Sequence, residues 1–451
     1  MKIIQSDEFD SYWKGRAVAK DDDAVESAVK EIIAAVRAEG DAAVRRYASR
    51  FDKSSPGQFE VPPAFAEEAA AGLRREDPEL AAAMELAADH ILRFSQKQKA
   101  QFSDFEYEME IGLVTGQRVI PVQRAAVYVP AGRFPLFSTV LMGLIPAFCA
   151  GVEEVFLASP PLEDGLPDRK ILAAAGIALA VAKKSGEKGI APGGRLRVFA
   201  VGGAQAIAAF ALGTESIPRA DVIAGPGNKY VAAAKRMLFG EVGIDFIAGP
   251  TDVLIIADGD IADGVSQAAD LAAADMIAQS EHDPDACARA LVPSGELALQ
   301  IAAALEKRLE TLPAAETARA SLEGGGLVIV YRNRENAARI ANTIAPEHLE
   351  LQTADAESWI PLLKNYGSLF IGGLSAEVLG DYSAGINHTL PTSASARFTG
   401  GLSVRHFLKT VTTLRCAPGD GFENARRAAA LLANAEGLAG HAASAAIREF
   451  L

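Results

Sequence analysis

The spacing of apolar residues divides the chain into a helical N-terminal part and a longer part in which strands and helices alternate. Between about residues 21 and 100, apolar residues recur three and four positions apart, which predicts amphipathic helices. From about residue 125, short apolar runs alternate with helical segments, and this predicts a parallel sheet with helices on both faces. The strands expected in this first series are AAVYVP, EEVFLASPP, RLRVFAVGG and DVIAGPGN.

A second series of the same kind predicts a second sheet. Its expected strands are DVLIIADG, ARALVP, GLVIVYRN, HLELQT and SLFIGG. After about residue 375 the chain is polar and irregular up to about residue 417, and it then ends in a helical run whose apolar face must dock against another surface. The predicted fold is therefore α/β, with two incomplete Rossmann-like parallel-sheet domains, a helical N-terminal segment and a C-terminal helical tail.

Composition and charge exclude several classes of protein. A chain of 451 residues with 49% hydrophobic and 23% charged content is typical of a globular protein of two or three domains. The net charge of -14 and the lack of a basic block argue against a nucleic-acid partner. The longest apolar stretch, residues 139–152, contains Pro146 and is shorter than the ~20 residues of a membrane-spanning helix. We therefore expect no membrane association.

Two features of the sequence predict a cytoplasmic location. Acidic residues occur close to the N-terminus, where a secretory signal has an apolar stretch behind a basic start. The cysteines Cys149, Cys287 and Cys416 are far apart and form no Cys-x-x-Cys pair, so we expect a reducing compartment and small buried thiols.

Glycines stand at two junctions between a predicted strand and a helix. The segments 202–210 and 225–235 place them where backbone N–H groups and the helix dipole favour an anion such as phosphate or pyrophosphate. Neither is the full dinucleotide fingerprint, because Tyr230 stands where the third glycine is needed. Each signal is weak alone, since glycine also serves ordinary tight turns.

Three polar clusters contain oxygen and nitrogen ligands that suit zinc. Gln279 and His282 are three residues apart in a helix expected to end just before Pro284, and Glu436 and His441 lie near the C-terminus. Asp381, Asn387 and His388 gather in the polar loop after SLFIGG, at the carboxyl end of a strand, where open sheets bind ligands. Taken singly, a helix cap is the favoured explanation for Gln279 and His282, and His441 among alanines can be a packed histidine. A surface turn is the alternative for the third cluster, weakened by the number of functional side chains gathered in eight residues.

Glu347 and His348 are adjacent in IAPEHLEL, where the chain turns from a loop into a strand. Neighbouring titratable groups in different environments can divide acid and base roles. Consecutive side chains of a strand point to opposite faces, so these two should diverge unless the backbone is irregular. A Glu-His dipeptide alone has no specific meaning.

Taken together, these segments resemble the histidinol dehydrogenase family from about residue 122 to the C-terminus. The motifs that carry the resemblance are VYVPAG, PLFSTVLM, VGGAQAIAAFALGTESIP, GPGNKYVAAAKR, IDFIAGPTDVLIIAD, AQSEHDPDA, IAPEHLEL, GDYSAGINHTLPT and EGLAGHA. The match is weaker over the helical N-terminal quarter.

The resemblance implies a set of functional residues at matching positions. The implied zinc ligands, one zinc per subunit, are Gln279, His282, Asp381 and His441. The implied general bases are Glu347 and His348, and the implied NAD contacts are Tyr128, Gln205 and Asn228. The implied substrate contacts are the four zinc ligands together with His348, Thr251, Glu436 and His388.

The resemblance also implies an activity and an assembly. The activity is the NAD-dependent, four-electron oxidation of L-histidinol through L-histidinal to L-histidine. The assembly is an intertwined homodimer in which the C-terminal tail reaches the active site of the other subunit. The implied domains are a zinc and catalytic-base domain (27–127 with 252–402), an NAD domain (128–251) and dimerisation segments (1–26 with 403–451).

Departures from the family pattern leave two other interpretations open. Thr251 stands where serine is expected, Ala131 replaces a glycine, the stretch 258–279 looks longer than usual, and the glycine-rich loop 185–195 looks like an insertion. The alternatives are a paralogous zinc and NAD dehydrogenase of another primary alcohol and a catalytically silent zinc-binding scaffold. The retained bases and ligands argue against the scaffold.

Overall fold

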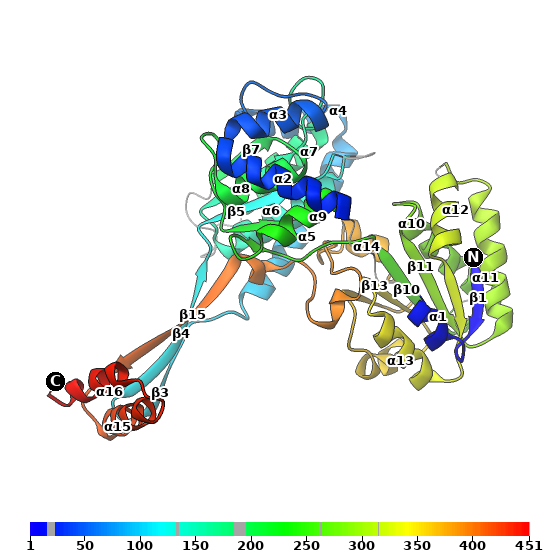
Figure 1. Cartoon of the computed structure of the whole chain (residues 1–451). Helices are drawn as coiled ribbons and strands as arrows, with labels where there is room; N and C mark the ends of the chain where they lie inside the picture. The colour runs from blue at the N-terminus through cyan, green and yellow to red at the C-terminus, as the bar shows by residue number, and fades with distance from the viewer. Residues whose placement is uncertain (16–22, 132–134, 185–194, 262–263, 314, 451) are drawn as a thin grey trace.

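The computed structural model describes residues 1–15, 23–131, 135–184, 195–261, 264–313 and 315–450. Figure 1 shows two α/β domains side by side and a long, narrow arm that carries the C-terminal helices away from them. The predicted loop 185–195 falls outside the described residues except for Arg195. In the part of the chain described, no helix is long and apolar enough to span a membrane.

The first sheet has the strand order β2-β7-β6-β5-β8-β9. Its parallel strands are β5 (Arg124–Tyr128), β6 (Glu154–Ser159), β7 (Arg195–Ala200), β8 (Val222–Ala224) and β9 (Gly243–Ile244), and β2 (Glu60–Val61) pairs antiparallel with β7. Following the chain, β5, β6 and β7 extend the sheet in one direction and β8 and β9 in the other. The order therefore reverses between β5 and β8, which is where a dinucleotide fold opens its crevice.

Helices cover both faces of the first sheet. They are α2 (Asp23–Glu39), α3 (Asp41–Phe51), α4 (Ala64–Glu76), α5 (Pro78–Lys99), α6 (Phe137–Ala150), α7 (Arg169–Lys184), α8 (Gly203–Leu212) and α9 (Lys229–Leu238). One apolar core joins α4–α7 to one face of β5, and a second joins α2, α3, α8 and α9 to the other face. The predicted boundary that placed 27–127 with the other domain is wrong, because the apolar faces of these helices are buried here.

The second sheet repeats the same reversal, with the order β1-β12-β11-β10-β13-β14. Its strands, all parallel, are β1 (Lys2–Gln5), β10 (Asp252–Ala257), β11 (Cys287–Val292), β12 (Leu327–Val330), β13 (His348–Gln352) and β14 (Ser368–Ile371). The helices α10 (Val265–Ser280), α11 (Gly295–Leu309) and α12 (Ala315–Gly324) cover one face. The helices α1 (Phe9–Gly15), α13 (Arg334–Ile344) and η1 (Ala356–Leu362) cover the other.

The N-terminal residues belong to this second domain. β1 pairs with β12, and the side chain of Phe9 on α1 is fully buried in the core below the sheet. Residues 1–15 thus pack within the second domain of this chain, and their role in dimerisation stays a prediction.

The arm is an antiparallel sheet that the sequence pattern did not predict. Its strands are β3 (Phe105–Glu110), β4 (Leu113–Pro121) and β15 (Leu408–Cys416), in the order β15-β4-β3. The helices α15 (Asp420–Ala435), α16 (Ala439–Ala446) and η4 (Ile447–Phe450) lie at its far end (Figure 1). Along the chain, the segment that joins β14 to β15 contains α14 (Glu377–Tyr382), η2 (Ser395–Arg397) and η3 (Val404–Phe407). The stretch read as irregular up to about residue 417 thus ends in a strand.

Candidate active site

The adjacent Glu347 and His348 lie at the amino-terminal edge of the second sheet, where β13 begins beside β10. α10 runs back along the sheet from the carboxyl end of β10, so its last turn brings Gln279 to the same edge, beside Thr251. The chain after β14 also turns back, and Asp381 on α14 reaches His348. The polar loop expected to act at the carboxyl ends of the strands therefore contributes to the opposite edge.

The carboxylate of Glu347 is buried and held against the start of β10. Its Oε2 lies 2.5 Å from Thr251 Oγ1 and accepts a hydrogen bond from Asp252 N at 3.1 Å, while Glu347 N donates to Asp252 Oδ1 at 3.0 Å. Asp252 is fixed in turn by Arg289 Nη1 at 2.7 Å. Burial raises the pKa of Glu347 to about 7, although the neighbouring His348 and Thr251 oppose this shift. Such a carboxyl group can exchange a proton near neutral pH.

The imidazole of His348 is buried among three carboxylates. Its Nε2 lies 3.4 Å from Asp381 Oδ1, and its Nδ1 lies 3.9 Å from both Glu347 Oε2 and Glu377 Oε2. Burial favours the neutral ring, but the carboxylates outweigh it and raise the pKa of His348 well above its ordinary value. The side chains of Glu347 and His348 therefore converge, contrary to the expected divergence. The backbone before β13 is irregular, since Ala345 has a φ of 51°.

Gln279 connects the acid–base pair to a further carboxylate. Its amide oxygen accepts from Thr251 Oγ1 at 2.5 Å and from Asp252 N at 2.9 Å, and its nitrogen donates to Glu377 Oε1 at 3.1 Å. The reverse orientation would put the amide oxygen against the Glu377 carboxylate. The single hydroxyl proton of Thr251 is thus shared between Gln279 and Glu347 as acceptors, which explains why a hydroxyl residue suits this position.

His282 and His388 are both close enough to Asp381 to influence its carboxylate. α10 ends at Ser280, earlier than predicted, so His282 is outside the helix and exposed. His388 Nδ1 lies 2.8 Å from the main-chain oxygen of Asp381, and its Nε2 lies 3.2 Å from Thr139 Oγ1 on α6. Burial is the largest influence on the pKa of Asp381 and raises it, but His348, His388 and His282 together bring it below its ordinary value. The loop that carries His388 thereby links the two domains.

The remaining predicted zinc ligand, His441, and the predicted substrate contact Glu436 are not at this site. Glu436 and His441 are exposed near and on α16, at the far end of the arm (Figure 1). Among the described residues there is no group of three His, Cys, Asp or Glu side chains that could hold a metal ion. The oxygen and nitrogen donors of Gln279, His282 and Asp381 suit zinc in type, and the buried Glu377 Oε2 has no hydrogen-bond partner in the part of the chain described. One chain alone therefore supplies an incomplete set.

The predicted NAD contacts lie at the carboxyl edge of the first sheet. Tyr128 ends β5, and its hydroxyl accepts a hydrogen bond from Gly203 N at 3.1 Å. Gln205, on α8, donates through Nε2 to Asp52 Oδ2 at 3.4 Å. Both side chains are buried, whereas Asn228 is exposed and caps α9, its Oδ1 accepting from two backbone N–H groups. The three residues therefore border the point where the strand order reverses.

Gly225 brings the two central strands of this edge together. It follows β8, has a φ of 108°, and a Cβ atom here would lie 2.1 Å from the main-chain oxygen of Tyr128. Only glycine tolerates both the conformation and the approach.

Sequence reasoning missed several acids of these sites. The side chain of Asp52, which follows α3, lies at the N-terminus of α8 and also accepts a hydrogen bond from Gly202 N at 3.3 Å. Burial raises the pKa of Asp52 to about 6. Glu377 stands four residues before Asp381, a spacing that puts both on one helix face and offered a signal. Asp52 and Asp252 offered none, because their partners are distant in the chain.

Comparisons with known proteins agree with this geometry. The family model described as histidinol dehydrogenase matches residues 16–449. The chain belongs to the histidinol dehydrogenase family. It is 42% identical over 430 residues to the histidinol dehydrogenase of Pseudomonas aeruginosa, covering 95% of this chain and 91% of that protein. It is 44% identical over 429 residues to that of Thermus thermophilus, covering 95% of each chain.

A solved structure supports the fold along the whole chain. The crystal structure of histidinol dehydrogenase from Elizabethkingia anophelis superposes with a TM-score of 0.86 at 32% identity, covering 99% of this chain and 97% of that one. Members of this family are NAD-dependent oxidoreductases, and the chain is one of them. The expected α/β class with two parallel-sheet domains is confirmed.

Proposed function

We propose that the chain oxidises L-histidinol to L-histidine in two consecutive NAD-dependent steps. In the first, the alcohol loses a hydride to NAD and a proton to the enzyme, giving histidinal. In the second, the aldehyde adds water, and the resulting gem-diol loses a second hydride to another NAD and a further proton. The observation that carries this proposal is the buried Glu347–His348 pair, two proton-accepting groups 3.9 Å apart.

The environments of the two residues assign their roles. His348 lies among three carboxylates, which stabilise the imidazolium formed when it accepts the proton of the substrate hydroxyl. Glu347, with a pKa near 7, would activate the water that adds to the aldehyde. Thr251 and Asp252 hold the Glu347 carboxylate in place. We propose His388 as a substrate contact. Binding and orienting the amino alcohol is the chemistry that zinc would supply.

We propose that zinc is held by Gln279, His282 and Asp381 of one chain and His441 of a second copy, with Glu436 beside it as a substrate contact. Exposed apolar side chains on the arm support a homodimer: Phe105, Tyr107, Leu414, Leu431 and Leu432. Phe105, Tyr107 and Leu414 share one face of the sheet, since Phe105 pairs with Gln117 and both Tyr107 and Leu414 pair with Thr115. An apolar surface of this kind indicates a protein interface.

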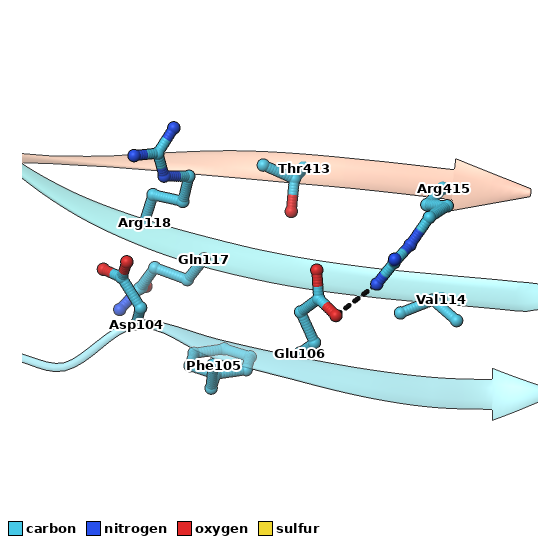
Figure 2. Close-up of a pocket in the computed structure, with 8 residues that line it drawn as sticks. All are labelled: Asp104, Phe105, Glu106, Val114, Gln117, Arg118, Thr413 and Arg415. Atoms are coloured by element: carbon cyan, nitrogen blue, oxygen red, sulfur yellow. Dashed lines mark hydrogen bonds and ion pairs between the residues drawn. The ribbon is translucent and has the colours of Figure 1, made fainter.

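The other face of the arm is polar. Figure 2 shows Glu106 paired with Arg415 across the sheet. With Asp104 and Arg118 they line a hollow of about 600 Å³, which Phe105 and Gln117 of the apolar face also border. The two faces therefore suit different surroundings, one a second copy and the other water. A cytoplasmic location is consistent with the free cysteines Cys149, Cys287 and Cys416, of which Cys149 alone is fully buried.

An NADH absorbance assay tests the function directly. Purified protein given histidinol and NAD should release two NADH per histidine formed, lose activity in chelator and regain it with zinc. Turnover of a neutral primary alcohol with none of histidinol would favour the paralogue, and no turnover of either would favour the silent scaffold. Full activity in metal-free protein would contradict the proposed zinc ligands.

A further inference from the structure

A buried ion pair in the first domain holds a single glycine, and the mechanism above does not use it. Lys235 on α9 contacts Asp245, which follows β9, and their side chains are only 3% and 0% exposed. Lys235 Nζ donates to the main-chain oxygen of Gly225 at 3.0 Å, and Asp245 Oδ2 accepts from Gly225 N at 2.8 Å. Both polar main-chain groups of one residue are therefore held by one ion pair.

The position of Gly225 makes this pair informative. The loop 225–228 passes directly over the end of β5, with no room for a side chain between Gly225 and the main-chain oxygen of Tyr128. Asp245 is itself fixed, because its Oδ1 accepts from Phe246 N at 2.7 Å. Three residues after Gly225, the same loop ends at Asn228, the cap of α9. The pair thus sets the shape of the loop where the strand order reverses.

Stability alone does not account for the pair. Removing two charges from water is costly, and apolar residues of similar volume are often as stabilising as a buried ion pair. An ion pair does, however, provide a donor and an acceptor of fixed geometry, which apolar side chains lack. Here Lys235 donates a hydrogen bond to Gly225, and Asp245 accepts one from the same residue.

Resting on the proposed function and on the predicted NAD contacts Tyr128, Gln205 and Asn228, we propose that Lys235 and Asp245 are positioning residues for the cofactor. They hold the loop 225–228 in the conformation that binds the dinucleotide, without touching it. Their loss should therefore weaken NAD binding and leave the chemistry at Glu347 and His348, on the other sheet, intact.

Three variants of the full-length protein separate this role from a structural one. Lys235→Met leaves the Asp245 carboxylate unpaired, and Lys235→Met with Asp245→Leu removes both charges. Arg197→Met is the matched control, because it breaks an ion pair with Glu60 on the same sheet, away from the loop. For each variant, the KM for NAD, the KM for histidinol, kcat, the Kd for NAD by calorimetry and Tm are measured.

Lys235→Met should lower Tm and raise both the KM and the Kd for NAD about 10- to 100-fold, since a charged donor is lost and a buried carboxylate loses its partner. We expect kcat at saturating NAD and the KM for histidinol to stay within about twofold of wild type. The double variant should regain most of the lost Tm and still bind NAD weakly. Arg197→Met should lower Tm without changing NAD binding.

Two results would overturn the inference. One is a folded Lys235→Met protein that binds NAD as wild type does, and the other is a double variant that recovers NAD affinity together with Tm. If the wild-type chain bound NAD but turned over no histidinol, the proposed function would be wrong. The Kd for NAD of the Lys235 and Asp245 variants would still test this inference. A wild-type chain that binds no NAD would overturn both.

Discussion

The two sheets share one strand order but carry their candidate functional residues at opposite edges. In the first sheet, Tyr128 and Asn228 lie at the carboxyl ends of the strands, where the order reverses. In the second, Glu347 and His348 lie at the amino end of β13. Strand order therefore predicts where a crevice forms but not where the chemistry is placed.

The carboxyl edge of the second sheet carries an acidic side chain where its two central strands end. Asp258 lies at this edge, directly after β10, the strand that corresponds to β5 of the first sheet, whereas Gly225 follows β8. Asp258 Oδ2 accepts from Ala354 N at 2.9 Å, so a carboxylate bridges the two central strands. An anion at this position repels phosphate and takes up a backbone donor that could otherwise bind it. Side chains, rather than topology, thus distinguish the two edges.

The largest expected effect comes from the amino edge of the second sheet. His348→Asn removes the proton acceptor of both oxidation steps and should reduce kcat for histidinol and for histidinal by ~10² to 10⁴. Stopped-flow measurement of NADH release gives both rates, and zinc content and Tm should stay close to wild type. His406→Asn, in η3, is the control for the substitution itself. A near-normal rate in His348→Asn would transfer the role of base to His388.

Glu347→Gln should divide the two half-reactions. Without a carboxylate to activate water, oxidation of supplied histidinal should fall by ~10² or more, while the first hydride transfer from histidinol falls far less. Single-turnover traces with each substrate separate the two steps. Equal loss in both would show that Glu347 is not confined to the hydration step.

A mixed dimer tests whether the arm completes the site of another chain. His441→Ala and His348→Asn homodimers should each be nearly inactive, because each lacks an essential side chain in both sites. After subunit exchange, one of the two sites in a mixed dimer has an intact His348 and receives an intact His441. Up to about half of the wild-type activity per mixed dimer should return if the sites are independent. No recovery, with zinc measured per dimer, would place His441 in the site of its own chain.

The smallest expected effect lies at the carboxyl edge of the first sheet. Burial raises the pKa of Asp52 to about 6, so the folded state binds its proton more tightly than the unfolded state does. The stability contributed by that proton is fully present below the unfolded pKa of about 4 and is lost as pH rises through 6. Asp52→Asn should therefore gain Tm relative to wild type between pH 4 and pH 7, by a few degrees at most. A difference in Tm that does not change with pH would mean that Asp52 is not buried as a titrating group.

The sequence predicted those parts of the fold that depend on local pattern. The central strands are short apolar runs, and each predicted run of both series contains a strand. The arm was missed because its strands are largely exposed, so no alternating buried set marks β15. The placement of α2–α5 was missed because an apolar helix face shows that it is buried but not against which sheet.

The same limit applies to the sites. Glu347, His348 and Asp381 came from a resemblance, and the structure brings their side chains together. Lys235 and Asp245 carried no sequence signal, since a lysine in an amphipathic helix and an aspartate after a strand are usually solvated. Their partner is a backbone, which a sequence pattern does not reveal.

The position of β1 constrains the order in which the chain can fold during synthesis. This strand, residues 2–5, is made first but forms its ladder with β12, residues 327–330. The core around α2, α3, α8 and α9 can form as soon as the first domain has emerged from the ribosome, whereas the core around α4–α7 also contains Leu402, Val404 and Phe407, and β1 has no partner until most of the chain is made. Closing so long a loop costs entropy that grows only slowly with its length, so the delay is kinetic rather than thermodynamic. A tag fused before β1 would stay attached to an unpaired strand until β12 has been made and the second sheet has formed.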